Sequence, residues 1–288
     1  MNASILMSAV LLVGTLSLLA AVAFRTVRVV PSTFEMEQAL SRMNTTTLVA
    51  SLAGLLFALW AWVTLPTAMA STTRVPGLLA ALGPATADLV YLGVVAVGEA
   101  TWRGPTGPAR AANLARRPRY SRAQRWASRA LAAWATLLAL CVVMFGAIAE
   151  PDGRSLAARS ADGCVVDAVP VPCDSTVVGP FPGWAYGGPI ALGAAALLAA
   201  TLGVLYLIAR RPAVPGASSA EDEILRTVSA TRVVRGSQLA IGTTVAGVLL
   251  FAGAAAGNAG WWWSWTAVAL AVGVLGTSMA ASARRVAP

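Results

Sequence analysis

Two carboxylates and a tyrosine stand in an apolar stretch of this sequence, where they form a candidate intramembrane polar site. With a valine and a tryptophan they follow the spacing i, i+3, i+7, i+11 and i+14, which places all five on one helix face: Asp88, Tyr91, Val95, Glu99 and Trp102. At a rise of 1.5 Å per residue, Asp88 and Glu99 are about 16 Å apart along that helix. This distance rules out a catalytic carboxylate pair, but the two acids could serve as stations on a path for protons or cations.

Asp88 has two interpretations, which differ in how deep it lies in the membrane. In the first, Pro84 opens a helix and Asp88 stands in its first turn, where free N–H groups and the helix dipole stabilise a carboxylate. Asp88 then lies near the outer interface and Glu99 near the inner one, beside Arg103. In the second, the helix begins near Gly77 and Asp88 lies inside the membrane, where a carboxylate costs about 3 kcal/mol and needs a partner. We favour capping, and the second interpretation stays open.

Several kinds of chemistry are excluded by the residues that the chain lacks. It has no lysine and no histidine among its 288 residues. A retinal Schiff base, an imidazole haem ligand, a histidine-containing zinc site and a serine–histidine pair are therefore ruled out. The three cysteines show no C-x-x-C spacing, so the sequence predicts no thiol-redox motif. We expect no enzymatic activity, no cofactor and no metal site.

Seven long apolar segments divide the chain and predict an all-α membrane protein, a single bundle of seven transmembrane helices. Apolar residues make up 57% of the sequence and charged residues 11%, whereas a soluble domain has about 25% charged residues. We expect the spans at about residues 3–24, 46–68, 77–102, 130–149, 189–209, 239–257 and 262–282. In the sixth span, small residues at four-residue spacing, Gly242/Ala246 and Gly253/Gly257, predict the close approach of another helix.

The arginines indicate the direction of threading, because they are concentrated in alternate loops. Three of the 21, Arg74, Arg154 and Arg159, fall on one side, and the other 18 fall on the opposite side. By the positive-inside rule, the N-terminus is outside and the C-terminus is in the cytoplasm. The bias toward Arg, Ala and Gly is typical of a high-GC bacterial genome, so we expect a multi-pass protein of the bacterial plasma membrane. The pI is about 10.9. We attribute it to arginines that anchor the cytoplasmic loops and contact anionic lipid headgroups, and we expect no nucleic-acid binding.

Residues 103–129 form the most basic loop, which we expect in the cytoplasm. Toward the fourth span, Trp126 and other apolar residues share a helical face beside arginines. This pattern predicts an amphipathic lead-in that contacts anionic lipid headgroups. Docking of an acidic protein partner is the alternative for this loop. The residues assigned to this lipid or partner contact are Arg116, Arg117, Arg119, Arg122, Arg125 and Arg129.

Residues 150–187 form the only sizeable outer segment, and two cysteines there enclose the β-prone run VVDAVPVP. Outside the cytoplasm, Cys164 and Cys173 should be oxidised, and closing this short loop contributes roughly 2–3 kcal/mol through chain entropy. We therefore predict a Cys164–Cys173 disulfide in an extracytoplasmic loop, whose surface could meet a protein partner. Cys141 lies inside the fourth span and is interpreted as a small apolar residue.

The loops after the first and fifth spans resemble each other at an offset of 186 residues. Five identities fall in a short window: Arg25 with Arg211, Ser32 with Ser218, Glu35 with Glu221, Glu37 with Glu223 and Thr45 with Thr231. The spans that follow share AGLLFA and AGVLLFA after a small insertion. Two explanations stay open. The first is a true 3+1+3 repeat of parallel halves, a plan known among transporters. The second is that both loops independently carry the arginine, the capping serine and the acidic residues that commonly precede a membrane helix.

Two function classes follow from these patterns. The favoured one is a non-enzymatic assembly or regulatory component that works by contact, because packing faces and charged loops are present and no catalytic set is visible. The alternative is a carrier of a small solute or ion that uses the two repeat halves, with Asp88 as the binding or coupling group. Asp88 at the headgroups around a close-packed interior would favour the first class, and a polar cavity opening on Asp88 would favour the carrier.

Overall fold

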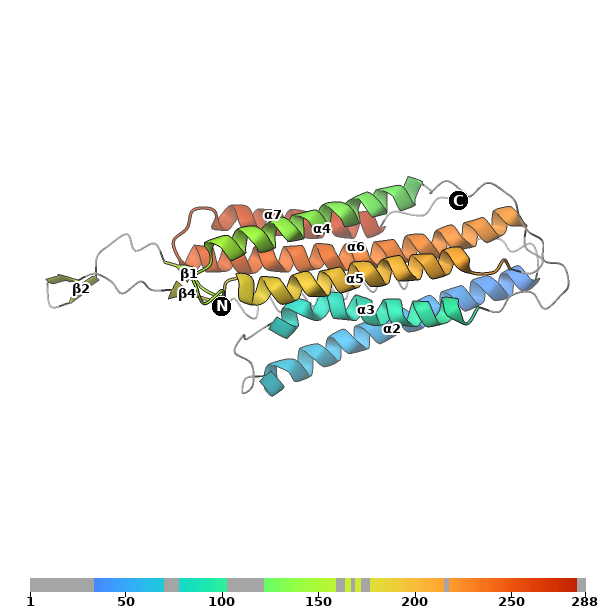
Figure 1. Ribbon diagram of the computed structural model, residues 1–288, viewed down its shortest axis with the longest axis horizontal. Coiled ribbons are helices and arrows are strands. Elements are labelled where there is room, and N and C mark those ends of the chain that lie inside the picture. The colour runs from blue at the N-terminus through green and yellow to red at the C-terminus, as the bar shows by residue number, and fades with distance from the viewer. Residues whose placement is uncertain are drawn as a thin grey trace.

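The computed structural model describes residues 34–69, 78–102, 122–158, 164–166, 169–171, 177–214 and 218–283 of the chain. These residues form six long helices and four short strands (Figure 1). The helices are α2 (Phe34–Met69), α3 (Leu78–Ala100), α4 (Arg122–Ile148), α5 (Trp184–Arg210), α6 (Ser219–Asn258) and α7 (Ser264–Ala283). The predicted first span, residues 3–24, lies outside the described residues.

Each of these six helices is long and apolar enough to cross a membrane, which makes the described chain compatible with a multi-pass membrane protein. The helices run alternately in opposite directions (Figure 1). α2, α4 and α6 begin at one end of the bundle, which we call the basic end because it carries Arg42, Arg125 and Arg211. The opposite end carries β1 and β4 and is called the strand end (Figure 1).

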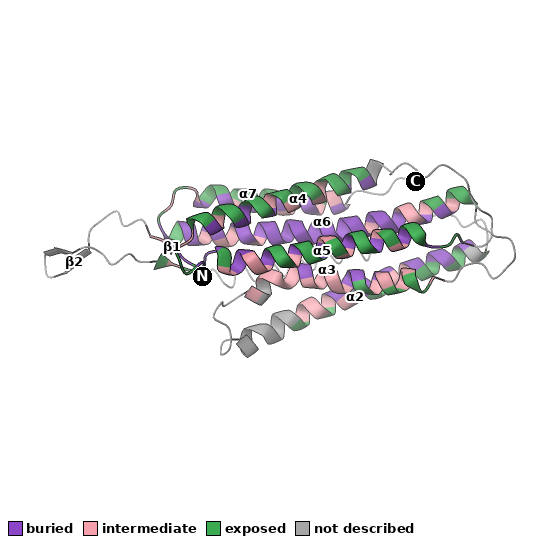
Figure 2. Ribbon diagram, in the orientation of Figure 1, coloured by how far each residue is buried: buried purple, intermediate pink, exposed green. Residues whose placement is uncertain are grey.

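α6 is the centre of the bundle (Figure 2). In its most apolar window 78% of the residues are buried, against 22–28% in the other five helices. α3, α4, α5 and α7 pack around it, and α2 packs against α3 on the outside. The outer helices expose large apolar side chains, among them Leu140 of α4 and Leu202 of α5, as helices that face lipid do.

α6 and α7 approach closely at the glycines that the sequence singled out. An added Cβ at Gly253 would lie 3.0 Å from the carbonyl oxygen of Ser264, and one at Gly242 would overlap the Ser278 hydroxyl. Gly257 also faces α7, since its added Cβ would be 3.5 Å from the Cβ of Ser264. The prediction that these glycines allow close approach of a neighbouring helix is therefore confirmed.

Four helices begin earlier than the predicted spans, three of them at the basic end and α5, at Trp184, at the strand end. α2 starts before residue 46, α4 before residue 130 and α6 well before residue 239, so most of the predicted loop after α5 is helical. A capping box starts α6: Ser218 Oγ accepts from the Glu221 N–H at 3.3 Å, and the Ser218 N–H donates to Glu221 Oε2 at 2.8 Å. The amphipathic lead-in to the fourth span was predicted from its helical face and is the start of α4. Hydropathy marks only the apolar part of a helix, so the polar turns at the start of α6 were missed.

α3 runs without interruption through Pro84, where the sequence predicted a break. The Thr86 hydroxyl donates to the carbonyl oxygens of Leu82 and Gly83, both at 3.0 Å, within the turn that Pro84 disturbs. Asp88 therefore lies in the middle of α3 and not in its first turn. The capping interpretation of Asp88 is wrong for this reason.

The predicted outer segment contains two small antiparallel sheets. β1 (Leu156–Ala157) pairs with β4 (Val177–Val178), and β2 (Cys164–Val166) pairs with β3 (Val169–Val171). The β-prone run between the cysteines is thus a hairpin, with Cys164 opposite Val171. Cys173 lies outside the described residues, which contain no disulfide, so the Cys164–Cys173 bond stays a prediction. Cys141 is a buried free thiol in α4, as expected.

The helix bounds follow the 186-residue offset found in the sequence. That offset carries the described residues 34–69 of α2 onto residues 220–255, which lie within α6. It also carries Leu78, the first described residue of α3, onto Ser264 of α7. Both helix pairs match at this offset without an insertion. The AGLLFA segment of α2 and the AGVLLFA segment of α6 therefore lie at different positions along their helices, contrary to the sequence interpretation.

Candidate functional site

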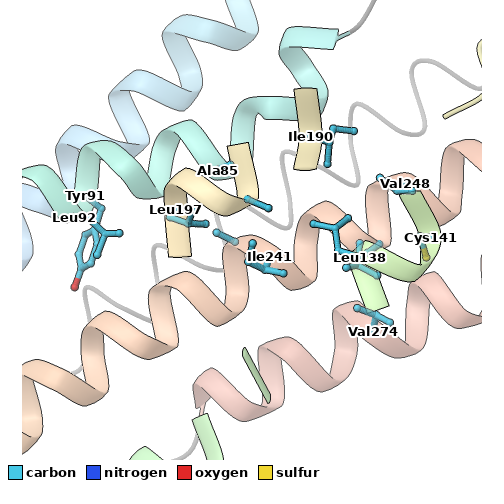
Figure 3. Packing of buried hydrophobic residues seen from close by; sticks show 14 of the residues in the cluster. Ala85, Tyr91, Leu92, Leu138, Cys141, Ile190, Leu197, Ile241, Val248 and Val274 are labelled. Carbon is cyan, nitrogen blue, oxygen red and sulfur yellow. The ribbon is translucent and has the colours of Figure 1, made fainter. Parts of the chain in front are cut away.

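The predicted stripe on α3 faces the inside of the bundle. Asp88, Tyr91 and Val95 are buried, and the two remaining residues of the stripe continue the same face toward the basic end. Figure 3 shows Tyr91 in the core to which α5 contributes Leu197 and α6 contributes Ile241. The stripe is therefore set against the central helix and not against lipid.

Asp88 lies where α3, α5 and α6 meet. Its carboxylate hydrogen-bonds with the side chain of Ser237 in α6, and the Ser237 hydroxyl lies 2.7 Å from the hydroxyl of Thr201 in α5. Gly236 leaves room for the carboxylate, because an added Cβ there would be 3.0 Å from Asp88 Oδ1. The second oxygen, Oδ2, is buried and has no hydrogen-bond partner within the described part of the chain. Asp88 thus forms a polar site inside an apolar core.

A narrow cleft lies between Asp88 and the basic end, where α2, α3 and α6 come together. Its polar lining comprises Thr46, Thr47, Tyr91, Glu99, Ser229 and Arg232. Arg232 reaches from α6 to α2, where Nη1 donates to Thr47 Oγ1 and Nη2 donates to Asn44 Oδ1, both at 3.0 Å. The cleft extends as far as Tyr91, and Asp88 does not line it.

The basic end of the stripe belongs to a buried ion-pair network. Glu99 Oε2 accepts from Arg211 Nη1 at 3.4 Å, and Arg211 Nη2 is 3.9 Å from Asp222 Oδ1. The Arg211 side chain is 0% exposed, and its guanidinium carbon lies 4.3 Å from the ring centre of Trp102. Burial lowers the pKa of Arg211, while the charges of Glu99 and Asp222 oppose that shift. The network joins the ends of α3 and α5 to the start of α6.

Arg226 extends this network and closes the end of α5. Its Nε donates to Asp222 Oδ2 at 2.7 Å. Its Nη groups donate to the carbonyl oxygens of Ala209 and Arg211, at 2.9 and 2.6 Å. The last carbonyls of a helix lack partners within it, so a cation here both satisfies them and complements the helix dipole.

The arginines predicted to contact lipid or a partner are only partly described. Three of them lie outside the described residues: Arg116, Arg117 and Arg119. Arg122 is the first residue of α4, and Arg125 and Arg129 are exposed on the turns that follow. The guanidinium of Arg129 lies 5.9 Å from the ring centre of the exposed Trp126. An exposed basic helix start agrees with a lipid or partner contact, which stays a prediction.

Sequence reasoning missed the partners of the candidate residues. Thr201 stands in an apolar segment, where a single hydroxyl carries no signal, and Ser237 stands in the predicted loop just before the sixth span. Arg211 was interpreted only as a topological anchor, although the structure pairs it with Glu99. The one local signal was an acid and an arginine at i, i+4 spacing in the loop after the fifth span, which belong to the same network.

Comparison with known proteins assigns neither a family nor a function to the chain. The chain matches no known protein family, no curated protein and no solved structure. The geometry of the site is therefore the basis on which a function rests.

Proposed function

We propose that the protein is a non-enzymatic, multi-pass carrier of the bacterial plasma membrane, which moves a small solute or ion together with protons and uses Asp88 as the coupling group. The observation that carries this proposal is the burial of Asp88 between α3, α5 and α6, with Oδ2 unpartnered among the described residues. A carboxylate among membrane helices is costly and is typical of substrate and proton paths. Such a group can take up and release a proton.

The surroundings of Asp88 support a path toward the basic end. From Asp88 the inner face of α3 continues past Tyr91 to the cleft at Arg232 and then to Glu99. In the opposite direction, toward the strand end, the buried face of α3 is apolar at Ala85. Polar groups are thus arranged on the basic side of Asp88, which favours proton exchange with that side.

We further propose seven spans, with residues 3–24 as the first, an outer N-terminus and a cytoplasmic basic end. The arginine distribution supports this direction. The shared offset of the pairs α2–α3 and α6–α7 supports a 3+1+3 repeat with α4 as the connector. Carriers built from repeats hold their substrates at the interface of the halves. Asp88 of the first half meets Gly236 and Ser237 of the second, as such a site requires.

The proposed topology is tested with a reporter enzyme that is active only in the cytoplasm. Fusions after Arg129 and after Pro288 should be active, and a fusion within residues 155–180 should be silent, because arginine-rich segments stay inside. Activity of the fusions at both residue 129 and residue 170 would remove α4 as a span and with it the proposed arrangement.

Asp88→Asn should abolish proton flux while the amount of folded protein stays the same. The amide keeps the shape of the side chain and a hydrogen bond to Ser237, but it cannot carry a proton. The measurement is the internal pH of liposomes that hold the purified protein and a pH-sensitive dye, under an imposed membrane potential. Glu223→Gln neutralises an exposed carboxylate at the basic end and should leave the flux near that of the wild type.

Two outcomes of this experiment speak against the proposal. Equal proton flux in the wild type and in Asp88→Asn would contradict the coupling role of Asp88. A wild-type protein no faster than empty liposomes, with small solutes and ions also supplied across the membrane, would contradict proton-coupled transport.

A second candidate function is an assembly or regulatory component that works by contact with another protein. The observation that favours it is the close-packed interior, since α6 is buried along most of its length and the cleft stops short of Asp88. The exposed start of α4, at Arg125 and Arg129, is the surface proposed for an acidic partner. Co-purification of a stoichiometric partner, together with a wild-type protein that moves no protons, would select this function.

A further inference from the structure

We infer that Ser237 and Thr201 are positioning residues for the proton of Asp88, and that Asp88 carries this proton in the conformation described here. The inference deepens the coupling role proposed for Asp88 and rests on it. Asp88 of α3 hydrogen-bonds with the side chain of Ser237 in α6. Ser237 Oγ lies 2.7 Å from Oγ1 of Thr201 in α5, and Thr201 Oγ1 donates to the carbonyl oxygen of Leu197 at 2.7 Å. A chain of hydrogen bonds thus joins the carboxyl group to the main chain of α5.

The hydrogen atoms available decide in which direction this chain runs. Each hydroxyl has a single hydrogen to donate, and the Leu197 carbonyl oxygen only accepts. Thr201 therefore donates to Leu197, and Ser237 donates to Thr201. The other acceptor near Ser237 Oγ, the carbonyl oxygen of Val233, is farther away at 3.3 Å. Asp88 must then be the donor to Ser237, which is possible for a carboxylic acid and impossible for a carboxylate.

The surroundings of Asp88 also suit the neutral acid. Oδ2 is buried without a hydrogen-bond partner, and no arginine in the described part of the chain forms an ion pair with it. A buried charge without a cation is far more costly than a neutral carboxyl group.

The helices packed around Asp88 bring few charged or titratable groups near it. α2 and α5 carry theirs only toward their ends. On α6, Arg232 donates to Thr47 and Asn44 of α2, and Arg235 points to nearly the opposite side of the helix from Ser237. On α3 the nearest titratable group is Tyr91, one turn away. The hydroxyl chain is therefore the polar contact that responds to the proton on Asp88.

Release of this proton reverses the chain. A charged carboxylate only accepts, so Ser237 then donates to Asp88 and Thr201 donates to Ser237. The proton leaves for the basic end, and the two hydroxyl hydrogens reorient by rotation about their C–O bonds. Thr201 loses its bond to the Leu197 carbonyl oxygen in this state. The charge of Asp88 in α3 is in this way linked to a main-chain contact of α5.

Infrared spectroscopy of the purified full chain at neutral pH tests the inference, because a protonated carboxyl group has a carbonyl stretching band that a carboxylate lacks. The wild type should show this band, and Asp88→Asn should lose it. Thr201→Val keeps the shape of the side chain but removes a hydroxyl that bonds to Ser237 and not to Asp88. It should move the band to higher wavenumber, because a shortened chain weakens the bond that the acid donates. Thr201→Ser restores the hydroxyl and should restore the band position.

Thr244→Val is the matched control, since it removes another buried hydroxyl, which donates to Ala240 within α6 at 2.9 Å. It should leave the band in place. Ser237→Ala covers the case in which Thr201→Val does not fold, and it should move the band further in the same direction because the acid loses its acceptor.

Three results would overturn the inference: no band that depends on Asp88, an unmoved band in the folded variants of Thr201 and Ser237, or an equal shift in Thr244→Val. The spectrum requires no transport. A wild type that shows the band and its shifts but moves no protons would contradict the proposed carrier function alone, so the two failures are seen separately.

Discussion

Replacing Arg211 with glutamine should destabilise the protein by about 3–5 kcal/mol, because it leaves a buried carboxylate without its cation. Arg211 Nη1 lies 3.4 Å from Glu99 Oε2, and the Glu99 side chain is only 7% exposed. Asp222 keeps Arg226 at 2.7 Å, so Glu99 bears most of the loss. The measurement is the unfolding of the purified protein in detergent, by heat and by denaturant.

Two further variants separate this ion pair from the general effect of removing a charge. Arg210→Gln removes the neighbouring exposed arginine, which donates to the Tyr206 hydroxyl, and should change stability by less than about 0.5 kcal/mol. Adding Glu99→Gln to Arg211→Gln should recover part of the loss, since Glu99 is then no longer a buried charge. Equal destabilisation by the substitutions at 210 and 211 would contradict a structural role for the buried network.

Gly242→Ala should destabilise the contact between α6 and α7 by about 1–3 kcal/mol, as overpacking of a close-packed core does. The new Cβ would overlap the Ser278 hydroxyl and lie 3.0 Å from the Ser278 Cβ. Trp134 of α4 stands 3.4 Å from the same point, so there is little room for α6 to move away from α7. Unfolding in detergent, measured as for Arg211→Gln, reports the loss.

Gly247 is the matched control in the same helix, because an added Cβ there meets nothing within 4 Å. Gly247→Ala should be neutral or stabilise the protein by up to about 1 kcal/mol, since alanine favours a helix more than glycine does. Ser278→Ala in combination with Gly242→Ala should recover part of the loss, because the overlapping hydroxyl is gone. Similar destabilisation by Gly242→Ala and Gly247→Ala would point to a general need for glycine in α6 and away from the contact with α7.

Hydropathy and helical spacing were enough to predict a bundle of long apolar helices and the faces on which its polar and small residues lie. An apolar run long enough to cross a membrane has to satisfy its own backbone, and a helix does so with local hydrogen bonds. Helical spacing likewise places Asp88, Tyr91 and Glu99 on one face, whatever that face packs against. Gly242 and Gly253 were identified in the same way, because their four-residue patterns are a property of a single helix.

Where those faces point, and which residues they contact, depends on how the helices pack against one another. Pro84 indicated a helix start, but the turn before it is helical as well, and Asp88 is therefore buried between three helices. Ser237 reaches Asp88, and Arg211 reaches Glu99, across more than a hundred residues of chain. Such contacts depend on the angle and register at which whole helices pack, and no spacing within one segment encodes them.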